Sequence, residues 1–229
     1  MLCAFIGCGS DDPEKQTSIR ADTTPVGGTS AALLHDSGVE LFASGLASED
    51  LDAIIQAIDL LEQAAIGAPS NNVYWLDLAD AYMNSGLATE YPYAIETYWM
   101  LYQEKDPQAD AILARLANAY QEVGNRKAAF DVASERLKQA NEKQSGSAGL
   151  QLTLLAFANG GIDKTVELLV DKADDLDEPG TMLMLAASLK ELVNDREAAL
   201  DLVEDALDEL DKNSPSAKLA EQMRGRMLP

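Results

Sequence analysis

The segment Asn72–Pro107 reads NVYWLDLADAYMNSGLATEYPYAIETYWMLYQEKDP, and its spacing decides the fold class. Its first half carries bulky and small apolar residues three, one and three positions apart, at Trp75, Leu78, Ala79 and Tyr82. That interval places the side chains on one helix face. Gly86 breaks the pattern, and a second helical series follows at Ala94, Tyr98 and Leu101. The segment therefore predicts two helices joined by a turn.

The same pattern recurs along the chain. A copy 38 residues later has Leu113, Leu116, Ala117, Tyr120 and Gly124. A third has Leu150, Leu154, Phe157 and Gly161. A fourth turn, Asn194–Ala199, echoes Gly124–Ala129 after 70 residues. A weaker first copy has Val39 and Phe42, then Ala57, Leu61 and Ala64.

This spacing resembles the tetratricopeptide repeat, whose consensus is W-x₂-L-G-x₂-Y…A-x₃-F…P. The resemblance implies an all-α fold, a right-handed α-solenoid of about five helix hairpins with a C-terminal capping helix. We expect the repeat domain over residues 30–213 and the capping helix and tail over 214–229, where Ser214-Pro215 is typical of a helix start. An all-helical bundle with accidental periodicity is the alternative, and the glycine breaks in phase disfavour it.

Particular residue types fit this packing. Small residues are expected where helices cross, at Ala79, Ala117, Ala187, Ala129, Ala199 and Ala206. Gly86, Gly124 and Gly161 are expected to end helices with a positive φ. Gly146 and Gly149 are expected in a loop between hairpins.

The start, Met1–Cys8, reads MLCAFIGC and resembles the lipobox of bacterial lipoproteins. In that family the signal is cut before the cysteine, here Cys8, whose sulfur takes a diacylglycerol. Residues 1–8 are shorter than a complete signal, and we expect the recorded start to lie inside a longer one. The alternative is a cytoplasmic protein whose apolar start has no meaning.

The residues after Cys8 extend this hypothesis. Gly9 and Ser10 are the residues that the lipoprotein family shows at an outer-membrane destination in Gram-negative cells. Residues 9–29 are rich in Ser, Thr, Asp, Gly and Pro, so we expect a flexible tether with a reach of roughly 25 Å. The expected location is the periplasmic face of the outer membrane, and the alternative is the cytoplasm.

The charge limits the partners. With 39 acidic and 17 basic residues the net charge is −22, which disfavours nucleic acid and anionic lipid surfaces. Asp171–Asp211 holds 14 acidic and 3 basic residues. A solvated helical face is the interpretation we favour, with a steering surface for a basic partner as the alternative. The stretch lacks the ligand spacing of an EF-hand, so we expect no metal site.

No catalytic constellation is present in the sequence. His35 is the single histidine, beside Asp36, and we expect a surface or capping residue. Cys3 and Cys8 are the two cysteines, and both precede the repeats. Phosphate-binding and hydrolase motifs do not occur. We therefore expect no enzyme activity, no cofactor and no small-molecule substrate.

In the repeat family the first helices line a concave groove that holds the ligand. That rule gives candidate partner-binding residues at Leu76, Asp80, Met83, Asn84, Arg115, Asn118, Gln121, Glu122, Gln151, Leu155 and Asn159. Some members grip a terminal carboxylate with lysines that this groove lacks, so a neutral-to-acidic groove for extended or helical protein segments is expected. Tyr91 and Tyr93 lie in the turn after Gly86, where they are either interface anchors or packed over the neighbouring hairpin.

The expected function is a protein-binding scaffold anchored at the bacterial envelope, which helps assemble a membrane or cell-wall complex. Relatives of this architecture serve outer-membrane protein assembly, pilus secretin assembly or cell-wall synthase activation. A cytosolic adaptor or regulator and an accessory subunit of an envelope enzyme are the two alternatives.

Overall fold

The computed structural model of the chain describes residues 30–104 and 106–228. All regular secondary structure in these ranges is helical, in eleven helices. In chain order they are α1 (Ala31–Ser48), α2 (Leu51–Gly67), α3 (Asn72–Asn84), α4 (Tyr91–Gln103), α5 (Ala109–Glu122), α6 (Arg126–Gln139), α7 (Glu142–Asn159), α8 (Ile162–Ala173), α9 (Gly180–Leu192), α10 (Arg196–Glu209) and α11 (Pro215–Met227). This arrangement confirms the all-α class and five successive helix pairs followed by a terminal helix. The lipobox and the tether, residues 1–29, lie outside the described ranges.

The chain divides into two compact units, Met1–Ser85 and Gly86–Pro229. This division passes through the repeat at Asn72–Pro107, leaving α3 in the first unit and α4 in the second. The reason lies in the packing partners, since α3 packs on α2 and α1 whereas α4 packs on α5. The domain bounds expected from the sequence, with the repeats over residues 30–213, stay a prediction.

In the first unit, α1 and α2 form a close antiparallel pair because α1 has glycines at the crossing. A Cβ atom on Gly38 would lie 2.9 Å from Leu61 Cγ, and one on Gly45 would lie 3.0 Å from Ile54 Cγ1. Any larger residue would push the two helices apart. Between α2 and α3, the buried Glu62 carboxylate accepts a 2.8 Å hydrogen bond from the Tyr82 hydroxyl.

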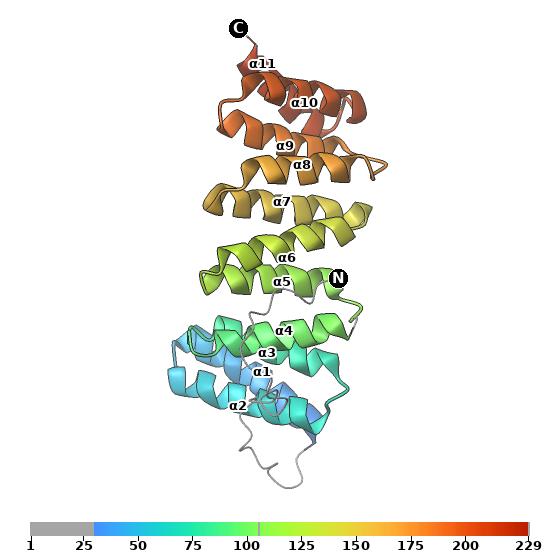
Figure 1. Ribbon diagram of the computed structural model, residues 1–229. Coiled ribbons are helices and arrows are strands. Elements are labelled where there is room, and N and C mark those ends of the chain that lie inside the picture. The colour runs from blue at the N-terminus through green and yellow to red at the C-terminus, as the bar shows by residue number, and fades with distance from the viewer. Residues whose placement is uncertain (1–29, 105, 229) are drawn as a thin grey trace, which may run out of the picture. The chain divides into compact units, whose positions relative to one another are not determined.

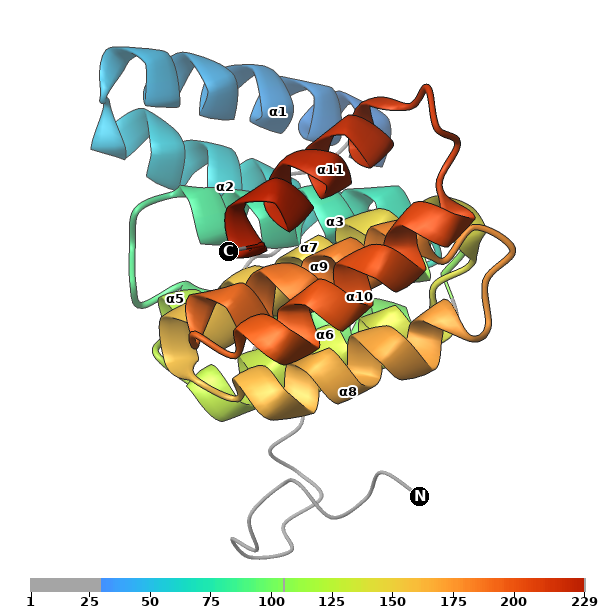
Figure 2. The ribbon, with the colours of Figure 1, turned by 90° about the horizontal axis from the view of Figure 1, so that it is seen from above.

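In the second unit, α4 to α11 follow one another in chain order along a stack (Figure 1). First helices also contact first helices, α5 with α7 and α7 with α9, while the second helix α6 contacts α8. The helices therefore form two layers, and α7 and α9 lie on the opposite side from α6 and α8 (Figure 2). This serial packing is the one expected of stacked helix hairpins.

The turns repeat the same backbone geometry. Gly86 and Gly124 have φ of 75° and 74°, and Asn194, 70 residues after Gly124, has φ of 62°. Gly160, with φ of 86°, caps the end of α7, and the predicted Gly161, with φ of 94°, is instead the N-cap of α8. The values at Gly86 and Gly124 confirm two of the predicted helix-ending glycines. The value at Asn194 confirms its echo of Gly124, because asparagine is among the few residues other than glycine that tolerate this region.

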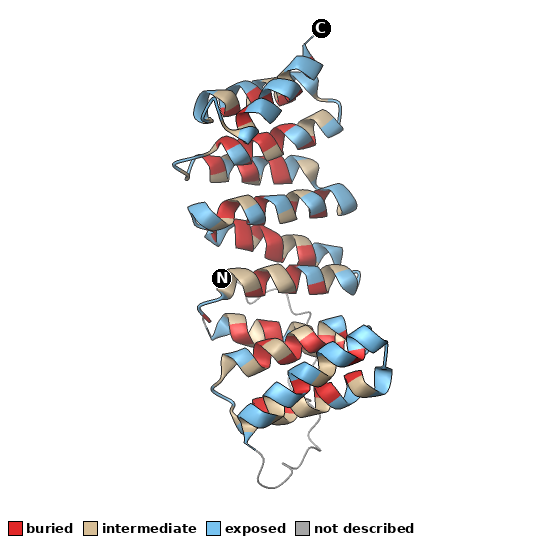
Figure 3. Cartoon of the chain, turned by 180° about the vertical axis from the view of Figure 1, so that it is seen from behind, coloured by how far each residue is buried: buried red, intermediate tan, exposed pale blue. Residues whose placement is uncertain are grey.

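Buried residues lie on the sides of the helices that face other helices (Figure 3). The smallest side chains of this core are alanines. The six alanines predicted at crossings are fully buried, namely Ala79, Ala117, Ala129, Ala187, Ala199 and Ala206. Leucines fill the adjacent spaces, as Leu113, four positions before Ala117, and the neighbouring Leu116 do on α5. The prediction of small residues where helices cross, with bulky residues beside them, is therefore confirmed at these positions.

The third repeat differs from its prediction in two ways. Gly146 and Gly149 lie inside the long helix α7, where a loop was expected. Asn141 and Gln144 start this helix with a capping box, and a Cβ on Gly149 would come within 3.0 Å of the Met182 sulfur. Gly149 therefore belongs to a close contact between α7 and α9.

The register of α7 also differs. The buried residues are Leu152, Leu155 and Ala156, whereas the predicted core residues Leu150, Leu154 and Phe157 are exposed. Leu155 and Ala156 correspond to Leu116 and Ala117 after 39 residues. Apolar side chains occupy several faces of α7, so spacing alone selected the wrong one.

The start of α9 provides a first testable prediction. A Cβ on Gly180 would lie 2.6 Å from Leu210 Cγ and Cδ2. Gly180→Ala is therefore expected to lower the free energy of unfolding by about 1–3 kcal/mol through overpacking. Gly225 in α11 has no atom within 4 Å of its ideal Cβ, so Gly225→Ala should raise that free energy by about 0.5–1 kcal/mol. Urea unfolding followed by circular dichroism measures both changes. Equal effects from the two variants would contradict the close approach at Gly180.

Candidate partner-binding surface

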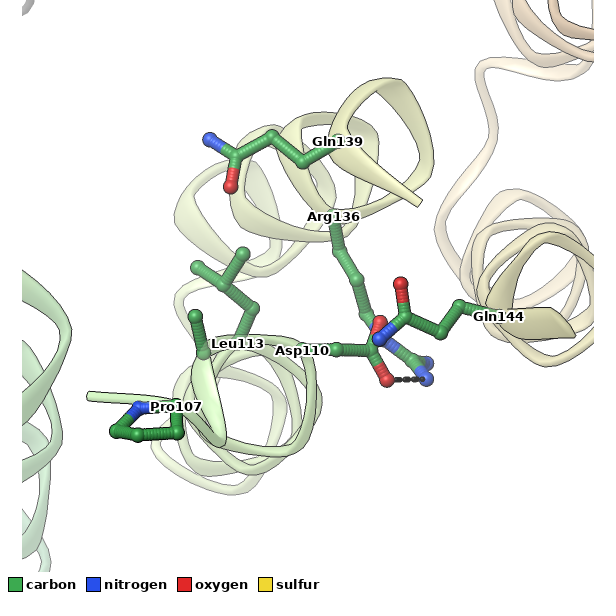
Figure 4. Close-up of a pocket in the computed structure, with 7 residues that line it drawn as sticks. Pro107, Asp110, Leu113, Arg136, Gln139 and Gln144 are labelled. Carbon is green, nitrogen blue, oxygen red and sulfur yellow. Dashed lines mark hydrogen bonds and ion pairs between the residues drawn. The ribbon is translucent and has the colours of Figure 1, made fainter. Parts of the chain in front are cut away.

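The most complete polar cluster in the second unit surrounds Arg136 on α6 (Figure 4). Its Nε and Nη2 donate to the two oxygens of Asp110 on α5 at 2.9 and 3.0 Å. On α7, Nη1 donates to Gln151 Oε1 at 2.9 Å and to Ser147 O at 3.4 Å, and Nη2 donates to Ser147 Oγ at 2.8 Å. The five guanidinium donors are thus all used.

A small pocket lies against this cluster, between the start of α5, the end of α6 and the start of α7 (Figure 4). Its lining includes Pro107, Leu113, Gln139 and Gln144 beside Arg136. Because Arg136 has no donor left for a ligand and is only 7% exposed, the cluster fastens three helices together. We interpret it as structural and not as a ligand site.

Amide side chains join the first helices α5 and α7. Gln151 Nε2 donates to Ala114 O and to Asn118 Oδ1, each at 2.9 Å. Farther along, Asn159 Nδ2 donates to Gln121 Oε1 at 2.9 Å. The structure therefore brings four of the predicted partner-binding residues together as two bonded pairs on the first-helix layer. Part of their hydrogen-bonding capacity already holds the helices in register.

Other predicted groove residues have different positions. Leu76 and Leu155 are only 7% and 6% exposed, so they belong to the core and are not available to a partner. Arg115 is half-buried and Glu122 is exposed on α5. In the first unit the remaining candidates on α3 are accessible to different degrees, with Asp80 and Met83 half-buried and Asn84 exposed.

Tyr91 and Tyr93 lie in the first turn of α4, with Pro92 between them, and not in the predicted loop insertion. Both are half-buried. Proline is favoured at this place because its missing N–H is not needed in the first turn of a helix. The two side chains are therefore carried on a helix, and they do not project from a flexible turn.

His35 also differs from its prediction as a surface or capping residue. Its side chain is only 13% exposed, and its ring stacks on Tyr74 of α3 with centroids 4.3 Å apart. Nε2 lies 2.7 Å from Asp77 Oδ2, and Nδ1 lies 3.3 Å from Asp36 Oδ1. The histidine thus connects α1 with α3, and sequence reasoning missed this because its partner Asp77 is 42 residues away.

The acidic segment Asp171–Asp211 presents carboxylates outward, as the prediction of a solvated face requires. On α10 the exposed acidic residues are Glu197, Asp201, Glu204, Asp205, Asp208 and Glu209. Lys190 is held by two aspartates, with Nζ 3.2 Å from Asp163 Oδ1 and 3.2 Å from Asp195 Oδ2. These hydrogen bonds, that of Asp163 first, raise the pKa of Lys190.

The feature that sequence reasoning missed is an exposed apolar stripe on α7. Leu150, Leu154 and Phe157 are 49%, 59% and 65% exposed, and they lie four and three residues apart on one helix face. On the flank toward α5, Gln151 donates to Ala114 O and Asn118 Oδ1, and next to it Ser147 contacts Arg136 of α6. The stripe therefore lies on the first-helix layer.

The opposite flank of α7 faces α9. A Cβ on Gly146 would meet Thr181 Cγ2 at 4.0 Å, and one on Gly149 would meet Met182. The stripe at Leu150, Leu154 and Phe157 consequently lies between the flank toward α5 and the flank toward α9. Three large apolar side chains this exposed on one helix face form a patch of the kind that marks interaction sites.

Two general properties complete the description. Within the described ranges, no cluster of three or more histidine, cysteine, aspartate or glutamate residues is arranged to hold a metal ion. None of the described helices combines the length and the hydropathy needed to span a bilayer.

No family model matches the chain, and no curated protein sequence matches it. Solved structures do resemble it. MamA is 21% identical, covers 80% of this chain and 92% of its own, and has a TM-score of 0.52. A double mutant of MamA RS-1 is 15% identical over 79% of this chain and 94% of its own, also at 0.52. A putative kinesin light chain of Podosopora anserina with nearly identical TPR-like repeats is 20% identical over 76% and 92%, at 0.50. At these identities the likeness is one of fold.

Proposed function

Because the chain has the all-helical fold of tetratricopeptide repeat proteins, we propose that it is a non-catalytic scaffold that binds another protein. The binding surface is the first-helix layer of the second unit, formed by α5, α7 and α9. The observation that carries this proposal is the exposed stripe at Leu150, Leu154 and Phe157. Elsewhere on α7 the large apolar residues Leu152 and Leu155 are buried, so the stripe is the apolar part of this helix that no described residue covers.

The stripe also indicates the chemistry of the partner. Its three side chains span about two turns, the length over which one amphipathic helix or one extended segment presents two or three apolar residues. The position corresponding to Phe157 is Asn118 on α5, 39 residues earlier, and the amides of α5 provide neutral hydrogen-bonding groups beside the stripe. The partner segment is therefore apolar at its centre and polar but largely uncharged at its edge.

The proposal includes the location. Cys8 in the lipobox-like start would carry the lipid, and residues 9–29 would link it to the repeats. One acyl chain binds a membrane weakly, at about 0.8 kcal/mol for each buried CH₂, so a stable anchor needs more than one chain. A diacylglycerol on Cys8 meets this requirement. The scaffold would then hold its partner at the bacterial envelope, where it helps assemble a membrane or cell-wall complex.

The stripe is tested by charge substitution in the full chain. Phe157→Asp and Leu154→Asp are expected to abolish retention of the partner when the protein is used as bait on detergent-solubilised envelope fractions. Leu219→Asp on α11 is the matched control, because Leu219 is 51% exposed and lies on a different helix. Proteins retained by the wild type and by Leu219→Asp, but lost with both stripe variants, support the proposal. Retention of the same proteins by all four forms would contradict it.

The anchor is tested separately. Metabolic labelling with palmitate is expected to mark the protein and to fail in Cys8→Ser, which should also leave the membrane fraction. Cys3→Ser is the matched control, since it removes the other thiol. Unlabelled wild-type protein in the soluble fraction would contradict the proposed envelope location and would not affect the proposed scaffold function.

A further inference from the structure

A second surface in this unit has the opposite electrostatic character to the rest of the chain. An open pocket of about 420 Å³ lies where the start of α6 meets the turn between α7 and α8. Arg126, Lys127 and Phe130 line it from α6, and Gly160, Gly161 and Lys164 line it from the turn and the start of α8. The lining thus brings together two segments, 126–131 and 159–164, that are far apart in the sequence.

The charge at this pocket is positive in a strongly negative protein. Three basic residues line it, and the one carboxylate in the lining, Asp131, is paired with Lys127 at 2.6 Å. Arg126 and Lys164 form no ion pair with any residue in the described ranges. Among the residues that the structure describes, these two cationic groups therefore have no counter-charge, although the whole chain has 39 acidic residues and only 17 basic ones.

The pocket also has an apolar wall. The Lys164 ammonium lies 5.2 Å from the centroid of the Phe130 ring, within the range of a cation–π contact. A Cβ on Gly161 would lie 3.5 Å from the same ring, so the bare backbone of this turn forms part of the wall. The Phe130 ring can contact carbon atoms of a ligand while Arg126 and Lys164 pair with the negatively charged groups of the ligand.

The backbone adds to the positive potential. Helices α6 and α8 both begin at this pocket, at Arg126 and Ile162, and the positive ends of their dipoles are located there. The α8 start has Gly161 as N-cap and no side-chain cap. Asn125 caps α6 by accepting a hydrogen bond from the Ala128 N–H.

From these features we propose that this pocket binds a carboxylate-rich segment of a partner protein. The chain's net charge of −22 opposes long-range attraction of any anion. At physiological ionic strength, however, charges farther than about 8 Å are largely screened, so the nearest cations dominate at contact. A short acidic peptide can contact these cations without reaching the acidic surface around them. A nucleic acid or an anionic membrane is larger, so the acidic surface would also repel it.

This inference is independent of the apolar stripe, because the two surfaces share no residue. The contacts at the pocket are exposed, so we expect weak binding, in the millimolar to high-micromolar range of small electrostatic sites. Such a site adds a second point of attachment for a partner that also contacts the stripe. Two linked weak contacts raise the overall affinity well above that of either one.

The test uses the full chain labelled with ¹⁵N and the peptide acetyl-tetraglutamate amide as the probe. We expect saturable amide shifts at Gly160, Gly161 and Lys164 at about 150 mM salt, where charges farther than about 8 Å are largely screened. Lys164→Glu and Arg126→Glu should each weaken binding by about tenfold or more. Lys164→Gln should weaken it less, and circular dichroism should show all variants to be folded.

Arg196→Glu is the matched control. Arg196 begins α10 as Arg126 begins α6, 70 residues earlier, and the reversal changes the net charge by the same amount. It should change the affinity by less than about twofold, because Arg196 is not among the residues that line the pocket. Equal weakening by all three reversals would show a general charge effect and would overturn the site.

Two further probes decide the ligand. Acetyl-tetraglutamine amide should cause no saturable shift, and equal binding of this neutral peptide would overturn the electrostatic argument. Inorganic phosphate tests a free anion. Saturable shifts with phosphate but none with tetraglutamate would show an adventitious ion only, and would overturn the assignment to a peptide. Phe157→Asp should leave the binding of tetraglutamate unchanged. The experiments can therefore contradict partner binding at the stripe without contradicting peptide binding at the pocket, and the reverse.

Discussion

Arg136→Ala is expected to lower the free energy of unfolding by about 3–5 kcal/mol. The reason is the carboxylate of Asp110, which is left without its bidentate partner between α5 and α6. Ser147 and Gln151 on α7 lose their donors at the same time. Urea unfolding followed by far-ultraviolet circular dichroism measures the change.

Three further variants separate the causes. Lys138→Ala removes an exposed basic residue from the same helix and should change the free energy by less than about 0.5 kcal/mol. The double variant Arg136→Ala/Asp110→Ala should cost less than the sum of the two single changes, because neither charge is then left without the other. Arg136→Met, which fills the space without a charge, should cost less than Arg136→Ala. A loss below about 1 kcal/mol for Arg136→Ala would show that water replaces these contacts.

Leu152→Ala is expected to lower the free energy of unfolding by about 2–5 kcal/mol, because the side chain is fully buried and its removal leaves a cavity. Leu154→Ala, two residues away and 59% exposed, should change it by less than about 0.5 kcal/mol. The pair is well matched, since both positions are leucines in the same helix. The same unfolding measurement decides between the two registers of α7. A larger loss for Leu154→Ala would restore the register that the spacing first indicated.

Much of the fold could be predicted because its determinants are local. The glycines at 86 and 124 and the asparagine at 194 mark turns that need a positive φ, and few residues accept that conformation. The alanines at helix crossings recur at fixed intervals for a similar reason. A larger side chain at Ala117 or Ala187 would separate two helices, so the requirement is visible in the spacing itself.

The register of α7 could not be predicted from spacing because the helix has two apolar faces. Leu152 and Leu155 are buried in the core. Leu150, Leu154 and Phe157 follow the same helical period, but they lie on a different, exposed face of the helix. A single sequence does not distinguish a helix face that packs in the core from an exposed helix face that could bind a partner. The conflict between the two series was nevertheless informative, because it coincides with the proposed binding surface.

The remaining misses depend on contacts between distant residues. Arg136 meets Asp110 and Gln151, which lie 26 and 15 residues away, and no local pattern distinguishes it from an exposed arginine near a helix end. His35 and Asp77 present the same difficulty. Tertiary pairing decides both features.

The equivalent turns at Gly124 and Asn194 bear on how such a chain can change in length. They are 70 residues apart and leave the backbone in the same left-handed conformation, so the two joints have interchangeable geometry. A duplication or deletion of the stretch between them would join one helix end to another through a turn of the same shape. Unequal recombination at these two turns could therefore add or remove whole helix pairs and keep the same turn geometry at the junction.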